Sequence, residues 1–299
     1  MTSQTFRTWI TSALVTGAVA VAAVALTTQD PDASPSSAGI AADALVGEAS
    51  SGTTVTNALD TSTAPTTEPS TDGLDAIDTD ARFSVSVLNV DTGQSLTYGT
   101  GAFDTASVVK VDILAALLHQ HERAGTELSE AEQALATAMI ERSDNDAATT
   151  LFEAVGGEAG LEAFDDEIGL TDTDVGSNGS WGLTQTTSAD QVSLLQVVLG
   201  DDSVLSPASR AYARTLMSNV VDSQRFGVSA AADDPDDAAL KVGYLQRSTT
   251  GRWDVTSTGE IESGGHTYVL TVLSDGNVSF DAGVALVDEV ARAAVSAMG

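Results

Sequence analysis

The order of strand-like and helix-like segments is the feature that most restricts how this chain can fold. RFSVSVLNV, which starts at Arg82, alternates apolar and polar residues, and SLTYG follows after the turn Asp91-Thr92-Gly93, which predicts a β-hairpin. Three further strand-like runs, LKVGYLQ, RWDVTSTGEIE and HTYVLTVLSD, come only late in the chain, before a closing helix from Asp281 to Met298. Strands from both ends can pair in one antiparallel sheet. We therefore expect an α+β fold in which a helical block is inserted between the N- and C-terminal strands and packs beside the sheet.

Local start and stop signals divide the central block into helices. Ser129 and Glu132 form a capping box, and Gly125, Gly156 and Gly169 follow apolar-periodic runs as helix ends. A polar, glycine-rich segment at 170–184 is expected to be a loop. The helices expected from these signals cover 107–122, 129–142, 145–155, 161–168, 189–199 and 207–220.

The first 80 residues are unlike the rest of the chain. Residues 1–26 combine Arg7 with an uncharged run from Ile10 to Leu26, and Ala23-Val24-Ala25 is a possible cleavage site. Both a cleaved signal peptide and a retained membrane anchor fit this pattern, and either predicts export of the rest. Residues 27–80 are acidic and rich in Thr, Ser and Ala, with few large apolar residues, which predicts a disordered stalk with a short helix near Leu74 to Ile77. A folded domain is expected over 81–299.

Composition excludes several classes of function. The formal net charge of −31 opposes binding to nucleic acid, because both partners are anionic. The chain contains no cysteine, so it has no disulfide, thiolate nucleophile or cysteine metal site. His119 and His121 are two residues apart and would face different sides of a helix. We therefore expect no metal and no cofactor, and we expect a monomer whose only membrane contact is through its N-terminal segment.

The chain has only two lysines, and one of them lies in its most apolar helix. Ser107 and Lys110 are three positions apart, so their side chains share a helix face. A serine hydroxyl becomes a good nucleophile when a base removes its proton, and a lysine made neutral by burial can serve as that base. Taken alone, the pattern also fits a lysine whose stem lies along a core helix and whose amine reaches water.

Two further triplets follow in the sequence. Ser143-Asp144-Asn145 lies between two expected helices, where a hydroxyl could relay a proton and an amide could hold a substrate, although such residues are also ordinary helix caps. Lys241-Val242-Gly243 opens an expected strand, where the lysine could bind an anion and Gly243 could let a substrate approach the strand edge.

Together and in this order, the three triplets resemble the Ser-x-x-Lys, Ser-Asp-Asn and Lys-Thr-Gly motifs of class A β-lactamases and penicillin-binding proteins. The resemblance extends to RSDNDAATTLFEAVGG and GLTQTTSADQVSLL, and it covers about residues 80–299. It implies a β-lactamase/transpeptidase-like fold and an exported serine hydrolase. The substrate would be a β-lactam or a peptidoglycan-like D-alanyl peptide.

The resemblance also implies a role for each matching residue. Ser107 would attack the substrate carbonyl, Lys110 would be the acylation base, directly or through a water, and Ser143 would pass a proton to the departing nitrogen. The substrate-binding residues would be Asn145, which holds a side-chain amide, Lys241, which attracts a carboxylate and lowers the pKa of Lys110, Gly243, and Tyr244. The backbone N–H groups of Ser107 and Tyr244 would form the oxyanion hole.

Two departures from the family pattern change the expected activity. Val242 stands where the family has Thr or Ser, so a hydroxyl for the substrate carboxylate is missing. The loop TDTDVGSNGSWGL lacks the glutamate that activates the deacylating water in β-lactamases. Its aspartates, Asp172 and Asp174, do not have the matching spacing. We therefore expect an acyl-enzyme that forms and persists, with efficient β-lactamase turnover left open.

Three other side chains could reach the cleft. Arg247 and Arg252 are candidates for a second carboxylate anchor, although surface positions on a strand fit them as well, and Trp181 could border the cleft or pack in the core. The alternative function is a non-catalytic cell-wall-binding or sensor domain that keeps the fold.

Overall fold

The computed structural model describes residues 69–299. The predicted signal, 1–26, and the predicted stalk up to residue 68 lie outside the described residues. The helices are α1 (Asp72–Asp75), α2 (Val109–Ala124), α3 (Glu130–Glu141), α4 (Asn145–Ala154), α5 (Gly157–Ile168), α6 (Ser188–Leu199), α7 (Pro207–Ser218) and α8 (Phe280–Ala297). The strands are β1 (Arg82–Asn89), β2 (Ser95–Tyr98), β3 (Phe103–Asp104), β4 (Gln185–Thr186), β5 (Ala239–Gln246), β6 (Trp253–Ser263) and β7 (His266–Asn277). Short 3₁₀ helices are η1 (Ala106–Val108), η2 (Trp181–Leu183), η3 (Asp222–Gln224), η4 (Gly227–Ala231) and η5 (Pro235–Asp237).

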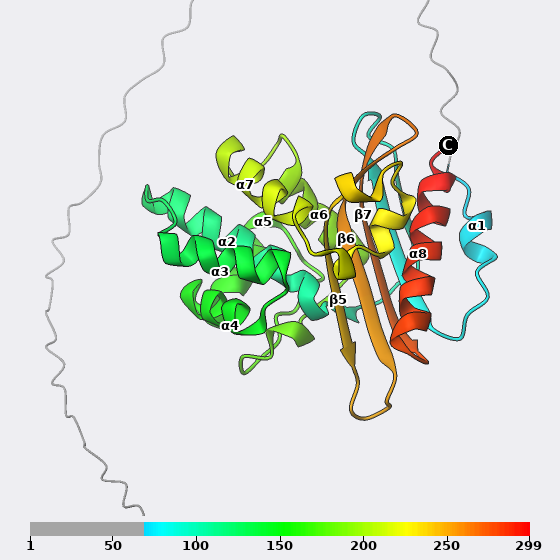
Figure 1. Cartoon of the computed structure of the whole chain (residues 1–299), viewed down its shortest axis with the longest axis horizontal. Coiled ribbons are helices and arrows are strands. Elements are labelled where there is room, and N and C mark those ends of the chain that lie inside the picture. Colours follow the sequence, from blue (N-terminus) through cyan, green and yellow to red (C-terminus); the bar gives the residue numbers. More distant parts are fainter. Residues whose placement is uncertain (1–68) are drawn as a thin grey trace, which may run out of the picture. The chain divides into compact units, whose positions relative to one another are not determined.

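One antiparallel sheet brings the two ends of the domain together. Its strand order is β2-β1-β7-β6-β5, and β1 pairs with β7 from Arg82 to Asn89. β5 is hydrogen-bonded to β6 only, so its other side is a free sheet edge. Figure 1 shows the helical block α2–α7 on one side of the sheet and α8 on the other. The α+β fold with an inserted helical block is confirmed.

Side chains and glycines fix the local boundaries that the sequence predicts. In the first hairpin, Asn89 Oδ1 accepts hydrogen bonds from the N–H groups of Asp91 at 3.0 Å and Thr92 at 3.1 Å, which closes the turn. The predicted capping box is present, with Glu132 N–H donating to Ser129 Oγ at 3.2 Å and Ser129 N–H donating to Glu132 Oε2 at 2.8 Å. α5 begins earlier than predicted, at Gly157 instead of Leu161, because Gly156 adopts a left-handed conformation before it.

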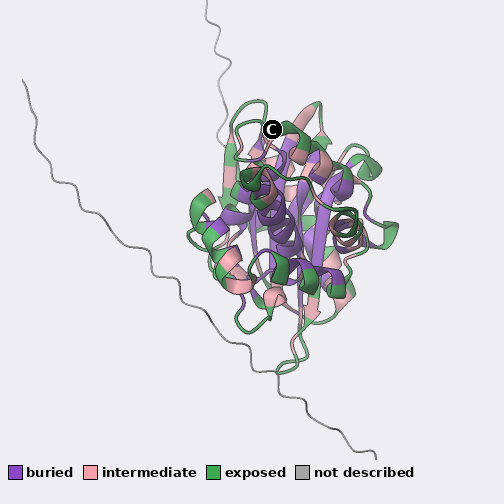
Figure 2. Ribbon diagram, turned by 90° about the vertical axis from the view of Figure 1, so that its left-hand side faces the viewer, coloured by how far each residue is buried: buried purple, intermediate pink, exposed green. Residues whose placement is uncertain are grey.

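Each face of the sheet is covered by helices. α8 packs on β1, β6 and β7 from one side, and α6 packs on the same strands from the other. In Figure 2 the buried residues fill the interior of both layers, and the exposed residues lie on the outside. α2 runs through the middle of the helical block and is buried from Val109 to His119. The N-terminal end of α2, next to Ser107, therefore points toward the sheet, where η1 contacts β5.

The folded domain begins before the boundary predicted at residue 81. The expected short helix is present as α1, where Leu74 is 1% exposed and packs in the core under α8. The Tyr98 hydroxyl also donates a hydrogen bond to Asp75 Oδ1 at 3.0 Å, which ties α1 to β2. Between residues 69 and 299, none of the helices has the length and apolar composition that a membrane span requires.

Candidate active site

Ser107 lies in η1, where the chain turns from β3 into α2. Ala106 precedes it with φ +47°, a left-handed conformation that costs an alanine about 1–2 kcal/mol. Val108 and Val109 are fully buried, so their packing holds the turn in place. Ser107 itself is half-buried and lines a cleft.

Lys110 lies one turn after Ser107 and is completely buried. Its ammonium donates hydrogen bonds to Ser143 O at 2.7 Å, Ser143 Oγ at 3.0 Å and Asn145 Oδ1 at 2.8 Å. These bonds use all three donors of a charged lysine. The amine also lies 5.1 Å from the centre of the Trp181 ring, a cation–π distance. The first and second sequence triplets therefore meet at Lys110.

Burial lowers the pKa of Lys110 from 10.5 to about 8, because the charged amine loses its hydration. The negative charge of Asp144 acts in the opposite direction and raises the pKa. A substantial fraction of Lys110 is therefore neutral just above neutral pH, which is the form that a base requires.

The Ser143-Asp144-Asn145 junction is shaped to present its oxygens to Lys110. Ser143 has φ +57°, and Asp144 caps α4 by accepting the Ala147 N–H at 2.8 Å. The structural role predicted for Asp144 is thus present. The cap starts α4 at Asn145, whose side chain then faces both Lys110 and the cleft.

Lys241 is also completely buried, on β5. Its amine donates to Gln224 Oε1 at 3.1 Å and to Val242 O at 3.1 Å. Burial lowers the pKa of Lys241 well below 10.5, and the nearby positive charge of Lys110 lowers it further. The sequence analysis expected the reverse, that Lys241 lowers the pKa of Lys110. Burial is the cause that lowers the pKa of Lys110, and Lys241 is not among the groups that shift it.

Alternation along β5 separates the third triplet into two faces. Leu240 and Val242 are buried in the core on the α8 side, and the Tyr244 ring packs against Phe280 with centroids 4.8 Å apart. Lys241 and Gly243 consequently face the helical block. Val242 is 1% exposed, so its side chain lies in the core and not in the cleft.

Gly243 is required by contact with η1. A Cβ at this position would lie 2.6 Å from Ser107 N, 2.7 Å from Thr105 O and 2.6 Å from Thr256 Oγ1. The sequence predicted that Gly243 makes room for a substrate. The structure instead fills that room with the backbone around Ser107, and Thr256 Oγ1 bonds Thr105 O at 3.1 Å to hold it there.

These elements enclose a cleft of about 440 Å³. Ser107 and Asn145 lie on its walls, together with Trp181 and the outer end of β5 at Tyr244 and Leu245. The full lining is Ala106, Ser107, Asn145, Thr149, Gly179, Ser180, Trp181, Gly182, Leu183, Tyr244 and Leu245. Within the described residues, this lining includes no aspartate or glutamate. The lysines and Ser143 lie behind it.

Comparison with protein families matches residues 132–298 to the β-lactamase enzyme family. The chain belongs to the β-lactamase family. The matched region starts after Ser107 and Lys110 and includes the second and third triplets. The resemblance inferred from the three triplets is therefore confirmed at the level of the family. No curated protein sequence matches the chain.

Several solved structures share this fold. A class A β-lactamase from Bacteroides cellulosilyticus is 17% identical, with a TM-score of 0.63, and the match covers 74% of this chain and 93% of that one. A protein described as PBP-A is 22% identical, with a TM-score of 0.64 and coverages of 75% and 92%. A variant of the class A β-lactamase of the last common ancestor of Gram-negative bacteria is 27% identical, with a TM-score of 0.59 and coverages of 73% and 92%.

The segment before β4 in this β-lactamase-family protein carries two aspartates whose backbone groups are hydrogen-bonded to other residues. Asp172 N–H donates to Asp190 Oδ2 at 2.8 Å, and the backbone of Asp174 pairs with Gln185 at 2.8 and 2.9 Å. Neither aspartate lines the cleft with Ser107. The loop therefore folds without bringing a carboxylate to the cleft wall.

The candidate anchor Arg247 is neutralised by two buried carboxylates. It forms ion pairs with Asp104 and, at 2.9 Å, with Asp254, and Gln185 Nε2 also donates to Asp104. Arg247 therefore connects the outer end of β5 to β3, three residues before Ser107. Arg252 donates to Gly276 O at 3.4 Å and lies outside the cleft lining. Neither arginine lines the cleft, and Arg247 is already paired with carboxylates.

Sequence reasoning missed Gln224 and Asp104. Gln224 lies in η3 and gives Lys241 its side-chain partner, and no local pattern in the sequence marks it. Asp104 directly precedes the buried turn to Ser107, and an acidic side chain directly after the apolar Phe103 is a signal of a buried ion pair. Across the described residues, no group of three or more histidines and carboxylates is arranged to hold a metal ion.

Proposed function

We propose that this protein is an exported serine hydrolase that is acylated at Ser107 by β-lactams or D-alanyl peptides and releases the acyl group slowly. The observation that carries the proposal is that Ser107 lines a cleft one helical turn from Lys110, whose amine bonds Ser143, and that the described lining of this cleft has no carboxylate. The family supplies the chemistry that these groups fit. The N-terminal pattern of residues 1–26 supports a location outside the cytoplasmic membrane.

Acylation begins when Lys110 loses a proton. The neutral amine keeps two N–H donors, one of which can stay on Ser143 Oγ at 3.0 Å, and gains a lone pair that can face the Ser107 hydroxyl. Lys110 accepts the Ser107 hydroxyl proton as the serine oxygen forms a bond to the substrate carbonyl carbon. Ser143 relays a proton to the substrate nitrogen as the carbon–nitrogen bond breaks. The products are an ester at Ser107 and a protonated leaving group.

The substrate is held by groups around Ser107. The contact between Gly243 and Ser107 N supports a pair of oxyanion donors from the backbone of Ser107 and Tyr244. Asn145 has its side chain at the cleft wall, where it can meet a substrate amide. Lys241 acts from behind the wall, because a bound carboxylate would favour its protonated form.

Deacylation requires a base for the attacking water. The cleft lining offers hydroxyls, amides and aromatic rings, but no carboxylate at the described positions. Lys110, which becomes neutral again when Ser143 relays the proton, is then the remaining base near the ester, and no carboxylate of the described lining assists it. We therefore expect the acyl-enzyme to accumulate.

The test is a time course of intact mass after mixing the protein with a fluorescent penicillin. The expected result is one covalent adduct that forms within the assay and decays slowly. Ser107→Ala should remove the adduct, whereas Ser180→Ala, a matched change of another serine in the cleft, should keep it. An adduct that survives Ser107→Ala would contradict the assignment of Ser107, and a wild type that stays unlabelled by penicillins and acyl esters would contradict acylation.

A non-catalytic wall-binding or sensor domain is the second candidate. The observation that favours it is that Lys110 directs its hydrogen bonds to Ser143 and Asn145, with none to Ser107. Such a domain would bind D-alanyl peptides equally well as wild type and as Ser107→Ala, without an adduct. Hydrolysis of a chromogenic cephalosporin that is lost in Ser107→Ala would decide for the enzyme.

A further inference from the structure

A second pocket lies at the opposite end of α2 from Ser107. Its volume is about 390 Å³, and it is walled by the last turns of α2, the loop to α3, and the start of α7. Glu122, on its wall, is roughly 18 Å from Lys110 along the helix axis, at about 1.5 Å per residue. The residues that line it are Leu118, His121, Glu122, Thr126, Glu127, Leu128, Gln133, Ser206, Ala208, Ser209 and Tyr212. It shares no residue with the cleft.

The hydrogen-bond donors in the wall of this pocket are already used. Ser209 Oγ donates to Glu122 Oε1 at 2.5 Å, and Ser206 N–H donates to both oxygens of the same carboxylate at 3.0 and 3.1 Å. Gln133 Nε2 donates to Leu128 O at 2.9 Å. The two ring nitrogens of His121 face Thr126 Oγ1 at 2.9 Å and Glu132 Oε1 at 3.2 Å. A ligand would therefore find few free donors in this wall.

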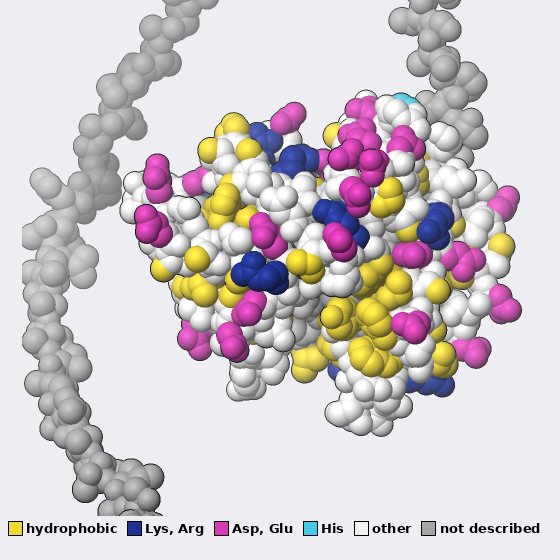
Figure 3. Space-filling view, in the orientation of Figure 1, with side chains coloured by type: hydrophobic (Ala, Val, Ile, Leu, Met, Phe, Trp, Pro, Cys, Tyr) yellow, Lys and Arg dark blue, Asp and Glu magenta, His cyan; other side chains and the backbone are white. Residues whose placement is uncertain are grey.

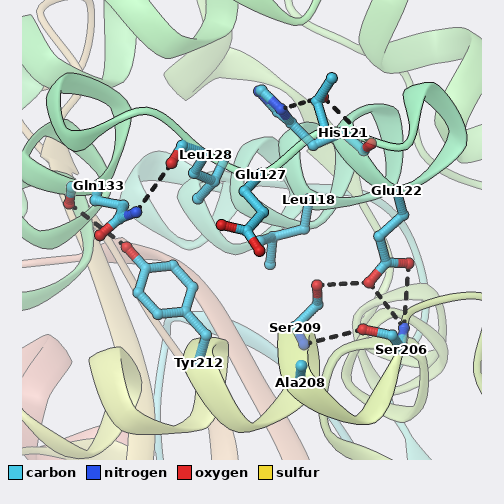
Figure 4. A pocket seen from close by; sticks show the side chains of 11 residues that line it. Leu118, His121, Glu122, Glu127, Leu128, Gln133, Ser206, Ala208, Ser209 and Tyr212 are labelled. Atoms are coloured by element: carbon cyan, nitrogen blue, oxygen red, sulfur yellow. Dashed lines mark hydrogen bonds between the residues drawn. The ribbon is translucent and has the colours of Figure 1, made fainter.

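Acceptors, in contrast, remain available. In Figure 4 the Glu127 carboxylate lies over Leu118, in the middle of the pocket, and no hydrogen bond is drawn to it. Glu122 keeps one further acceptor position, on Oε2. The floor is apolar at Leu118 and Leu128, and the Tyr212 ring forms part of the wall. An aromatic face and a carboxylate both attract a positive charge.

We propose that this pocket binds small organic cations that carry a primary ammonium on an apolar body. The ammonium supplies the donors that the wall lacks and pairs with Glu127, and the apolar body covers Leu118 and Leu128 beside Tyr212. The volume is at the small end of known ligand pockets, which suits a single ring with a short amine chain. The site is separate from the cleft and does not depend on the acylation chemistry.

The test uses phenethylammonium chloride as the probe, with binding followed by calorimetry and by NMR shifts. The expected result is saturable binding that weakens with added salt, while phenethyl alcohol, the neutral analogue, binds at least several-fold more weakly. Ser107→Ala should bind the probe as the wild type does. The failure of this proposal is thereby distinguished from the failure of the proposed function.

Variants locate the site. Glu127→Gln should weaken binding about three-fold or more, which is the size of one exposed charge pair. Glu130→Gln, a matched change of another exposed glutamate nearby, should leave binding unchanged. Ala208→Leu, on the exposed start of α7, should fill the pocket and abolish binding without changing the melting temperature. Equal weakening in Glu127→Gln and Glu130→Gln, binding that survives Ala208→Leu, or equal binding of the alcohol would overturn the proposal.

Discussion

The two faces of the central sheet differ in chemistry although they belong to the same strands. The face toward α8 carries apolar side chains such as Val85, Val242 and Val272, and together with α8 they form a dry core. The opposite face carries hydroxyls and an amine: Ser84, Ser86, Lys241, Thr256, Thr258 and Thr271, all buried. Period-two alternation creates this contrast, because neighbouring residues in a strand point to opposite faces.

The polar face is held together by hydrogen bonds, since unpaired buried polar groups are costly. Ser188 on α6 bonds Ser84 at 2.7 Å and Ser86 at 2.9 Å, and Thr258 bonds Thr271 at 2.6 Å. Thr256 extends this network to the turn before Ser107. The α8 face therefore stabilises the domain through burial, whereas the other face positions the candidate site.

A matching contrast appears at the surface. Figure 3 shows hydrophobic side chains gathered where β5 approaches the start of α8, and acidic side chains spread around them. The aromatic residues there are Tyr244, Trp253 and Phe280, with Trp253 and Phe280 centroids 5.7 Å apart. Tyr244 belongs to this cluster through its ring and borders the cleft as well. The apolar surface near α8 and the cleft with Ser107 therefore meet along β5.

The largest effect is expected on the polar side, from Lys110→Met. The change keeps most of the side-chain volume and removes the base, so the acylation rate with penicillin should fall about 10²–10⁴-fold. Stopped reactions analysed by intact mass give this rate. Thr137→Val, at a half-buried position of α3 outside the cleft lining, is a control that should leave the rate unchanged. A rate within ten-fold of the wild type would show that Lys110 is not the base.

Lys110→Met should also alter how stability depends on pH. In the wild type the pKa of Lys110 is lowered in the folded state, so the cost of burying its charge is complete below about pH 8 and vanishes as the pH rises to 10.5. At about 1.4 kcal/mol per pKa unit, the wild type should gain roughly 3 kcal/mol across this range from Lys110. Urea unfolding at several pH values should show that this gain is lost in the variant.

The next effect tests the contact between β5 and η1. In Gly243→Ala the new methyl would press on backbone atoms of Thr105 and Ser107, which cannot move away easily. We expect a loss of about 1–3 kcal/mol in the free energy of unfolding and slower acylation. Gly182→Ala is the matched control in the same cleft, because its methyl would meet only Ala106 O at 3.8 Å. Similar behaviour of the two variants would contradict the role assigned to Gly243.

A smaller effect is expected from Val242→Thr, which restores the residue type of the family. On the sequence alone, the new hydroxyl should improve binding of a substrate carboxylate. The structure places it in the α8 core, where we expect a loss of about 1–2 kcal/mol in stability and no faster acylation. Val272→Thr makes the same change on the same face, away from β5, and should cost a similar amount. Faster labelling of Val242→Thr would show that position 242 does face the substrate.

The outcome at Val242 illustrates what the sequence could and could not predict. Local patterns located the helix end at Gly125, the helix start at Ser129 and the first hairpin, because each of these depends on neighbours in the sequence. Alternation in LKVGYLQ puts Val242 on the same face as Leu240, whereas the motif by itself suggests a position at the substrate. Partners such as Gln224 for Lys241 and Asp104 for Arg247 depend on how distant segments pack, which no local pattern records.

The smallest effect concerns the pH dependence of acylation. Because Lys110 must be neutral to act, the acylation rate should rise about ten-fold per pH unit and level off near pH 8, the pKa of Lys110.

Asp144 raises that pKa by stabilising the ammonium. Asp144→Asn keeps the helix cap, since asparagine caps as well as aspartate, and removes the charge. The midpoint of the rate profile should therefore move to lower pH by a fraction of a unit. Asp146→Asn, two residues further along in the first turn of α4, should not move the midpoint. A midpoint that shifts upward in Asp144→Asn, or equally in both variants, would mean that the titrating group is not Lys110.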